Sequence, residues 1–218
     1  MTTMKTFKNT GKLILILIST LLFTKTYSQI SSGGIPYSFR NASISQNIPI
    51  EAMPSIDIKS LKEKDLLDDE KGRPYRFGID MEVNLGLQNS GQWETLSNGD
   101  RIWRLGIKSE GAYSINLIFN KYRLPEGARL FIYSEDQSYT IGAFTARNNK
   151  SHGKFSTTVV KGESIVLEYY EPKKVSFAGQ IVISKVIHAY RNTFFKNTKM
   201  GFGDSGSCNN NVNCPVGI

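Results

Sequence analysis

The sequence predicts an all-β protein whose body is an antiparallel β-sandwich, and three observations lead to this fold class. Between residues 75 and 192, apolar and polar side chains alternate in short runs, as in strands whose side chains point to opposite faces of a sheet. Turn-forming residues such as Asn98-Gly99 separate these runs at intervals of about 8–12 residues. No convincing helical periodicity interrupts them, and such a series of short strands is typical of a sandwich.

The N-terminus carries the pattern of a secretory signal peptide. Three lysines precede an apolar run over residues 13–23, and small residues lead up to Ser28. We expect residues 1–28 to be a signal peptide that is cut after Ser28, which predicts a secreted or periplasmic protein with no membrane association after the cut. The alternative is an uncleaved membrane anchor, but a spanning helix needs about 20 apolar residues and this run is shorter.

The next segment, residues 29–74, is predicted to be an extended linker that drapes over another part of the molecule. Pro36, Pro49, Pro54 and a Gly-Gly pair interrupt it. One or two amphipathic helical turns are expected around residues 60–69, where Leu61, Leu66 and Leu67 form a thin apolar edge.

The sandwich, residues 75–192, is expected to place large apolar side chains on one face of each strand. Arg104 and Glu168 alternate with such residues and are therefore expected on the solvated face. Residues 76–85 and 155–160 are expected to form two further strands. Trp93 and Trp103 are expected to supply much of the apolar area of the core. The residues expected to share one face within each run are Trp103, Leu105, Ile107, Ile115, Leu117, Phe119, Leu130, Ile132, Ile165, Leu167, Tyr169, Ile181 and Ile183.

Charge and composition exclude several function classes. The formal net charge is +8, but residues 1–28 hold four lysines and no acids, so the rest of the chain has an excess of only four positive charges. No basic stripe interleaved with aromatics is present, so nucleic-acid binding is not predicted. No phosphate-binding glycine loop follows a strand, and two histidines with two cysteines offer no zinc spacing, so neither a cofactor nor a metal is expected.

The C-terminal end carries the most specific pattern. Residues 193–204 lose the alternation and read as a connector, and Ser205-Gly206-Ser207-Cys208-Asn209 follows, with a second cysteine at Cys214. This stretch resembles the start of the mature domain of secreted bacterial lysyl endopeptidases, which are trypsin-like serine proteases. Segments at 98–105, 111–117, 142–145 and 167–172 also resemble the precursors of these proteases, in the same order, so that the likeness runs from about residue 76 to residue 215.

The resemblance implies a precursor in which a pro-domain helps a protease domain to fold and keeps it inactive until cleavage. Residues 205–218 would then be the truncated start of that protease domain, and the cognate partner of the sandwich would lie beyond the chain. Lys199 becomes the expected processing site in the connector 193–204. The resemblance also implies that Cys208 and Cys214 bond to distant cysteines of the protease domain, although the spacing alone also permits them to pair with each other.

A catalytic role for this chain itself is not predicted, and no catalytic residue is assigned. Gly203-Asp204-Ser205-Gly206 matches the tetrapeptide around the nucleophile of trypsin-like proteases, and two histidines precede it. However, His152 lies in a turn-like segment and His188 lies near the end of a predicted strand, so neither is expected to join a triad with Ser205.

A different function class remains open at the level of sequence. Residues 75–192 also suit a free-standing exported sandwich that binds carbohydrate or a surface polymer. In that case Trp93 or Tyr139 would be exposed and would stack on sugar rings.

Overall fold

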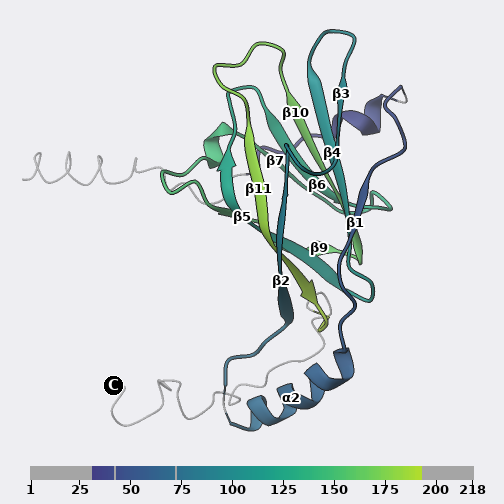
Figure 1. Ribbon diagram of the computed structural model, residues 1–218, viewed down its shortest axis with the longest axis vertical. Helices are drawn as coiled ribbons and strands as arrows, with labels where there is room; N and C mark the ends of the chain where they lie inside the picture. The colour runs from purple at the N-terminus through teal and green to yellow at the C-terminus, as the bar shows by residue number, and fades with distance from the viewer. Residues whose placement is uncertain (1–30, 42, 72, 193–218) are drawn as a thin grey trace, which may run out of the picture. The chain divides into compact units, whose positions relative to one another are not determined.

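The computed structural model describes residues 31–41, 43–71 and 73–192, and it confirms the predicted β-sandwich (Figure 1). Sheet A, the six-stranded sheet, is built around the order β1-β4-β10-β6-β7, with β3 also paired to β4. Sheet B, the five-stranded sheet, has the order β2-β11-β5-β8, with β9 also paired to β5. The strands of sheet A are β1 (Ile50–Ala52), β3 (Gln92–Thr95), β4 (Arg101–Lys108), β6 (Arg129–Ser134), β7 (Thr140–Phe144) and β10 (Ser164–Glu171). The strands of sheet B are β2 (Gly78–Gly86), β5 (Ser114–Arg123), β8 (Phe155–Ser156), β9 (Val160–Lys161) and β11 (Gln180–Ala189).

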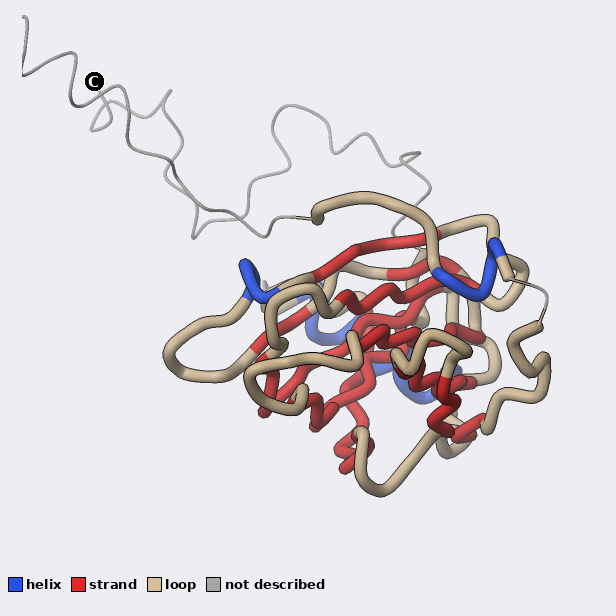
Figure 2. Tube along the Cα trace, turned by 90° about the horizontal axis from the view of Figure 1, so that it is seen from above, coloured by secondary structure: helices blue, strands red, loops and turns tan. Residues whose placement is uncertain are grey.

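The main core lies between the two sheets and consists of the predicted inward-facing side chains. Trp103, Leu117 and Tyr169 are each 0% exposed. All thirteen residues that were expected to share a face within their runs are buried in this core. The strands form the body of the molecule and loops join them at both ends (Figures 1 and 2). Since each strand alternates its faces, burial of these residues directs the intervening ones to the outer faces.

The outer face of sheet A is covered by the N-terminal segment, which we call the strap (residues 31–57, with residue 42 not described). The strap contains the 3-10 turn η1 (Tyr37–Arg40) and strand β1, which pairs in parallel with β4 (Figure 1). Ile44 is 2% exposed, and Phe39 and Ile48 pack on the side chains of β6, β7 and β10. The strap is therefore largely extended and lies over the outer face of sheet A.

The strap corrects the prediction for two charged residues. Arg104 and Glu168 were expected in solvent, but they are only 6% and 1% exposed. Strand alternation did place both on the outer face of the sheet. That face is buried because the strap adds a third layer over it, and a period-2 pattern carries no information about such a layer.

Helix α2 (Ile58–Glu70) follows the strap and is longer than the expected one or two turns. The side chain of Asp57 caps its N-terminus by accepting a hydrogen bond from the backbone N–H of Ser60 at 3.1 Å. Of the predicted apolar edge, Leu61 is half-buried, whereas Leu66 and Leu67 are 65% and 56% exposed. Its buried residue is Asp65. No helix of the described ranges is long and apolar enough to cross a membrane.

The expected strand at residues 155–160 is split into β8 and β9. Thr157 lies between them and bonds to β5 in a different way: its side-chain oxygen accepts from the backbone N–H of Leu117 at 3.0 Å, while its own N–H donates to the Leu117 carbonyl at 3.0 Å. A side-chain acceptor therefore takes one place in the ladder, which the alternation pattern does not reveal.

Candidate functional site

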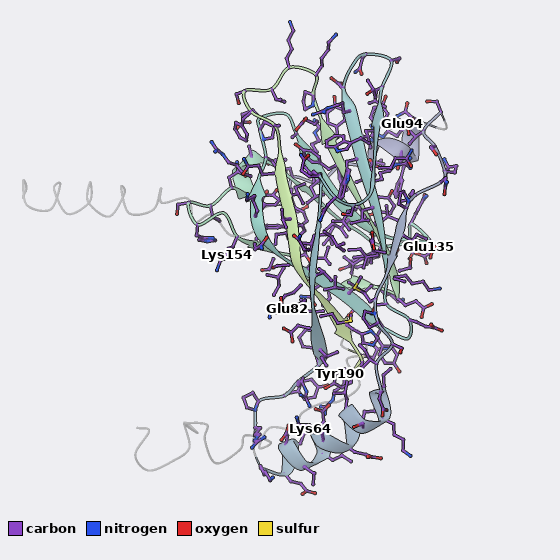
Figure 3. All side chains as sticks on the ribbon, viewed as in Figure 1. Lys64, Glu82, Glu94, Glu135, Lys154 and Tyr190 are labelled. Atoms are coloured by element: carbon purple, nitrogen blue, oxygen red, sulfur yellow. The ribbon has the colours of Figure 1, made fainter. Side chains whose placement is uncertain are left out.

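The buried carboxylate of Asp65 links helix α2 to the chain at the end of β11. Asp65 is 2% exposed and lies on α2. Its two oxygens accept hydrogen bonds from the Arg76 guanidinium at 2.6 Å and from the Tyr190 hydroxyl at 2.6 Å, and the Arg191 guanidinium lies 2.9 Å away. We call these four residues the exit clasp, because Tyr190 and Arg191 directly follow the last strand. Tyr190 lies between that strand and α2 (Figure 3).

The exit clasp holds Asp65 in its ionised form. Burial alone would raise the pKa of Asp65, but hydrogen bonds from Tyr190 and Arg76 and the charge of Arg191 outweigh burial and leave the pKa below its ordinary value. The carboxylate is therefore charged at neutral pH. Removing this carboxylate would take from the Arg76 and Arg191 guanidinium groups the buried acid that both of them bind.

Arg191 is also fixed by three contacts outside the clasp. Its backbone N–H donates to the carbonyl of Phe77 at 3.1 Å, its guanidinium lies 3.4 Å from Asp69, and it lies 4.4 Å from the centre of the Tyr75 ring. These contacts set the point at which the chain leaves the sandwich toward the predicted connector.

A second cluster of buried charges lies under the strap. The carboxylate of Glu168 accepts from the backbone N–H groups of Tyr37 at 2.5 Å and Ser38 at 3.3 Å. The guanidinium of Arg104 donates to the carbonyl of Ser45 and lies 3.6 Å from Glu94. Both charges thus bind backbone groups of the strap, and they hold it on the sheet.

A cavity of about 300 Å³ remains between the strap and sheet A. Arg104, Tyr133 and Glu135 line it from the sheet, and Gln46 and Asn47 line it from the strap. Burial and the charge of Glu168 raise the pKa of Tyr133 to about 12, so the hydroxyl stays protonated. The polar lining is typical of a space that holds water.

His188 does not form a catalytic pair with an acid in the part of the chain that the structure describes. It is 1% exposed, its Nδ1 shares a hydrogen bond with the Ser109 hydroxyl at 2.8 Å, and its Nε2 has no hydrogen-bond partner among the described residues. His152 is exposed in a loop and accepts from the backbone N–H of Lys154 at 3.0 Å. A triad needs a carboxylate that orients the imidazole, and neither ring has one there.

The aromatic residues considered for sugar binding do not form an exposed platform. Trp93 packs against the main core, its indole N–H donates to the Leu87 carbonyl at 3.0 Å, and the Arg101 guanidinium covers its ring at 4.5 Å. Tyr139 is likewise half-buried against the core. Sugar stacking needs a free ring face, which Trp93 does not present.

The predicted processing and disulfide residues lie outside the described ranges: Ser28, Lys199, Cys208 and Cys214. Ser205 lies outside them as well. Within those ranges, no group of three or more His, Cys, Asp or Glu side chains is arranged to hold a metal ion.

The exit clasp was not predicted from sequence. Asp65 lies in a strongly charged helix, where a carboxylate normally faces water, and its partners come from positions 76, 190 and 191. An ion pair between residues that lie more than 120 positions apart, such as Asp65 and Arg191, leaves no local pattern in the sequence. The one available signal was Arg191, an arginine directly after a predicted buried strand.

Residues 50–189 match the family model described as "Lysyl endopeptidase N-terminal domain". The matched region covers more than half of the 218 residues. No solved structure matches the chain.

Proposed function

The chain belongs to the lysyl endopeptidase N-terminal domain family, and from this we propose that it acts as the non-catalytic pro-region of a secreted serine protease precursor. The family supports a protease-precursor region.

One observation carries this proposal. The family match runs from residue 50 to residue 189, which are the first residue of β1 and the last residue of β11. The matched unit is thus the whole set of strands, in which the described histidines have no catalytic partner. A pro-region has to fold and bind a protease domain, and it needs no reactive group of its own.

The proposal assigns a role to each part of the chain. Residues 1–28 are a signal peptide removed after Ser28, and the sandwich binds the cognate protease domain, which it helps to fold and holds inactive. The connector 193–204 is processed after Lys199. Residues 205–218 begin the protease domain, in which Cys208 and Cys214 find their disulfide partners.

The test uses the full chain and a mature lysyl endopeptidase of the same family as the probe. The enzyme is unfolded in guanidinium chloride and diluted with or without the chain, and hydrolysis of a lysyl-amide substrate is followed. We expect a higher yield of active enzyme after refolding with the chain, and slower hydrolysis when the chain is added in excess to native enzyme. If the chain changes neither the yield nor the rate, the proposed function is wrong.

A matched control asks whether the chain itself is catalytic. The wild-type chain and Ser205→Ala should both leave the lysyl-amide substrate intact. Hydrolysis by the wild-type chain that disappears in Ser205→Ala would show an active site in this chain and would overturn the proposal.

A further inference from the structure

The edges of the two sheets differ in how they are protected from pairing with another chain. One edge of sheet A is made of β1 and β3, with three and four residues, and one edge of sheet B is made of β8 and β9, with two residues each. The strap covers the other edge of sheet A: the N–H of Ser32 donates to the Ala143 carbonyl at 2.9 Å, and the N–H of Ala143 donates to the Gly33 carbonyl at 3.2 Å. Short and covered edges are poor templates for a further strand.

Strand β2 is the remaining edge, and it is long. It has nine residues, and among the described strands it pairs only with β11 (Figure 1). A long edge of this kind presents a row of backbone donors and acceptors, to which an extended segment of another chain can add as a further strand. Its length and its single neighbour distinguish β2 from the three other edges.

Two hydrogen bonds at the ends of β2 show which of its backbone groups face away from β11. The carbonyl of Phe77 accepts from the N–H of Arg191 at 3.1 Å. The N–H of Leu87 donates to the carbonyl of Ile181 at 3.4 Å. Since backbone groups alternate in direction along a strand, the odd-numbered residues of β2 face β11 and the even-numbered residues face outward.

The far end of this outward edge is closed by the turn that follows β2. The side-chain amide of Asn89 donates to the carbonyl of Asn84 at 2.7 Å, and its oxygen accepts from the N–H of Gly86 at 2.9 Å. Both bonds agree with an outward direction of the even-numbered residues. They leave residues 78–82 as the open stretch, whose outward backbone groups belong to Gly78, Asp80 and Glu82.

The side chains of the open stretch define what an added strand has to carry. Asp80 and Glu82 lie on the outer face of sheet B, with side chains that are 52% and 73% exposed. Lys185 lies 2.6 Å from Asp80 and 2.8 Å from Glu82, so one positive charge faces two acids and negative charge is in excess. On the opposite face, Met81 and Val83 are only partly buried against the main core. Basic side chains opposite the acids and apolar side chains beside Met81 would stabilise the pairing.

We propose that residues 78–82 of β2 bind an extended segment of a partner protein as an additional antiparallel strand of sheet B, and that this segment alternates basic with apolar residues. Its basic side chains lie opposite Asp80 and Glu82, and its apolar side chains cover Met81 and Val83. The pairing is antiparallel because antiparallel ladders are slightly more stable per residue than parallel ones.

The same acids disfavour a second copy of this chain as the occupant. Pairing of two β2 strands would bring Asp80 and Glu82 of one copy against the acids of the other, and like charges directly opposite each other are destabilising. Charged side chains on an edge strand protect a protein from such self-pairing. The edge thus rejects its own copies and accepts a basic strand.

In the function proposed above, the added strand belongs to the protease domain, and that identity rests on the proposed function. The chemistry of the edge does not depend on it, so the edge is tested with a synthetic peptide. A failure of the peptide test is therefore distinct from a failure of the refolding assay.

The probe is a capped heptapeptide of alternating lysine and valine, added to the full chain labelled with nitrogen-15. Changes in the amide signals give the Kd, and solvent exchange of the amides is then measured by NMR with and without the peptide. At a peptide concentration of ten times the Kd, the N–H groups of Asp80 and Glu82 should exchange about tenfold more slowly, because they exchange only from the unbound form. Exchange of the Met81 N–H, which faces β11 in both states, should not change.

Matched peptides test the geometry and the charge of the edge. In an antiparallel ladder, residues that exchange hydrogen bonds lie directly opposite each other and share a face, so the lysines of the probe donate to β2. Methylation of the lysine backbone nitrogens should abolish binding, whereas methylation of the valine backbone nitrogens should retain it. A glutamate–valine heptapeptide should bind at least about tenfold more weakly, since it places acids opposite acids.

Two variants at one position test the strand itself. Glu82→Pro removes an outward N–H and keeps the odd-numbered groups that face β11, and an edge strand tolerates proline in this orientation. Glu82→Ala removes the same carboxylate and keeps the N–H. We expect Glu82→Pro to abolish binding of the lysine–valine peptide and Glu82→Ala to weaken it only about two- to fivefold.

Several results would overturn the proposal. They are no binding of the lysine–valine peptide, equal binding of the glutamate–valine peptide, and binding that survives either methylation of the lysine nitrogens or Glu82→Pro. Slow exchange of Asp80 and Glu82 in the chain without peptide, increasing with protein concentration, would assign the edge to a second copy instead. If any of these results accompanies a successful refolding assay, the edge proposal is wrong and the pro-region function stands.

Discussion

Glu168 and Arg104 are directly opposite each other on β10 and β4, yet each binds a group of the strap. Sequence alternation predicted correctly that both point away from the main core. It predicted their exposure wrongly, because their partners in the strap, Ser45 and Tyr37, lie 59 and 131 positions earlier in the chain. Local pattern fixes the face of a strand on which a residue lies, whereas burial of that face depends on distant segments.

Replacement of the Glu168 side chain should therefore be costly. Glu168→Ala removes the acceptor for the backbone N–H groups of Tyr37 and Ser38 and leaves them unpaired beneath the strap. We expect a loss of about 2–3 kcal/mol in the free energy of unfolding, measured by urea denaturation. The exposed Glu126→Ala should change it by less than about 0.5 kcal/mol. Equal effects of the two variants would mean that the carboxylate does not hold the strap.

At position 179 the packing requires a residue without a side chain. A Cβ at this position would overlap the hydroxyl of Tyr169, which is fully buried and donates to Glu171 at 2.8 Å. Gly179→Ala should cost about 2–3 kcal/mol, because neither ring nor backbone has space to move.

Gly106→Ala is the matched comparison for this substitution. Its added Cβ would lie 2.9 Å from Ile50 Cγ1, the side chain of an exposed residue that can rotate away. Urea denaturation should show a clearly smaller loss for Gly106→Ala than for Gly179→Ala, and the reverse order would contradict the packing around Tyr169.

At the scale of elements, helix α2 depends on charge rather than on apolar packing. Because the pKa of Asp65 is below its ordinary value in the folded protein, its contribution to stability is present above the unfolded pKa and is lost as pH falls through the folded pKa. Hydrogen exchange followed by mass spectrometry should show amides of α2 losing protection below about pH 3.8 before the strands of sheet A lose theirs.

Asp65→Asn should produce the same local opening at neutral pH. It leaves Arg76 and Arg191 without their buried partner, and we expect α2 to be destabilised by about 2–3 kcal/mol while the strands keep their protection. Asp69→Asn is the control, since Asp69 is partly exposed and exposed ion pairs contribute about 1 kcal/mol or less. If α2 stays protected in Asp65→Asn, the clasp does not hold the helix.

The elements differ in how well the sequence predicted them. The strands around Trp103, Leu117 and Leu167 were predicted because each of them carries large apolar side chains at every second position, and these face the main core. Strand β1 was not predicted, since it has only three residues and none of them is buried. Its sequence therefore lacks an alternation of buried and exposed positions. Helix α2 was predicted too short, because its stabilising contacts come from a buried acid, which periodicity of apolar residues cannot detect.

The whole sandwich should lose stability as the solution becomes mildly acidic. His188 is buried in β11, and burial lowers its pKa below 6.5. The unfolded chain therefore binds a proton before the folded protein does, and the free energy of unfolding should fall by about 1.4 kcal/mol per pH unit from pH 6.5 down to the folded pKa of His188. Urea denaturation at a series of pH values measures this slope.

The two histidines of the chain provide an internal control for that slope. His188→Gln should flatten the dependence between pH 6.5 and the folded pKa, whereas His152→Gln in the exposed loop should retain it. A slope that survives His188→Gln would mean that another group titrates in this range.

At the scale of the molecule, the fold class was predictable and the candidate site was not. Two sheets follow from alternation and turn residues, and the terminal Ser205–Cys214 pattern indicated the family. The exit clasp and the strap both join residues more than 100 positions apart, as Asp65 with Tyr190 and Tyr37 with Glu168 show. Such pairs form only when the complete chain has folded, so no local sequence pattern predicts them.

The strap has a consequence for the order of events when the protein is made. Tyr37 donates to Glu168, which lies 131 positions later in the chain. The strap is therefore synthesised early but can reach its final position only after nearly the entire sandwich has been made. Until β10 has been synthesised and has paired with β6, the strap lacks the Glu168 acceptor that holds it over Phe131 and Tyr133. The strap can therefore pack on sheet A only late in folding, after the strands of that sheet have paired.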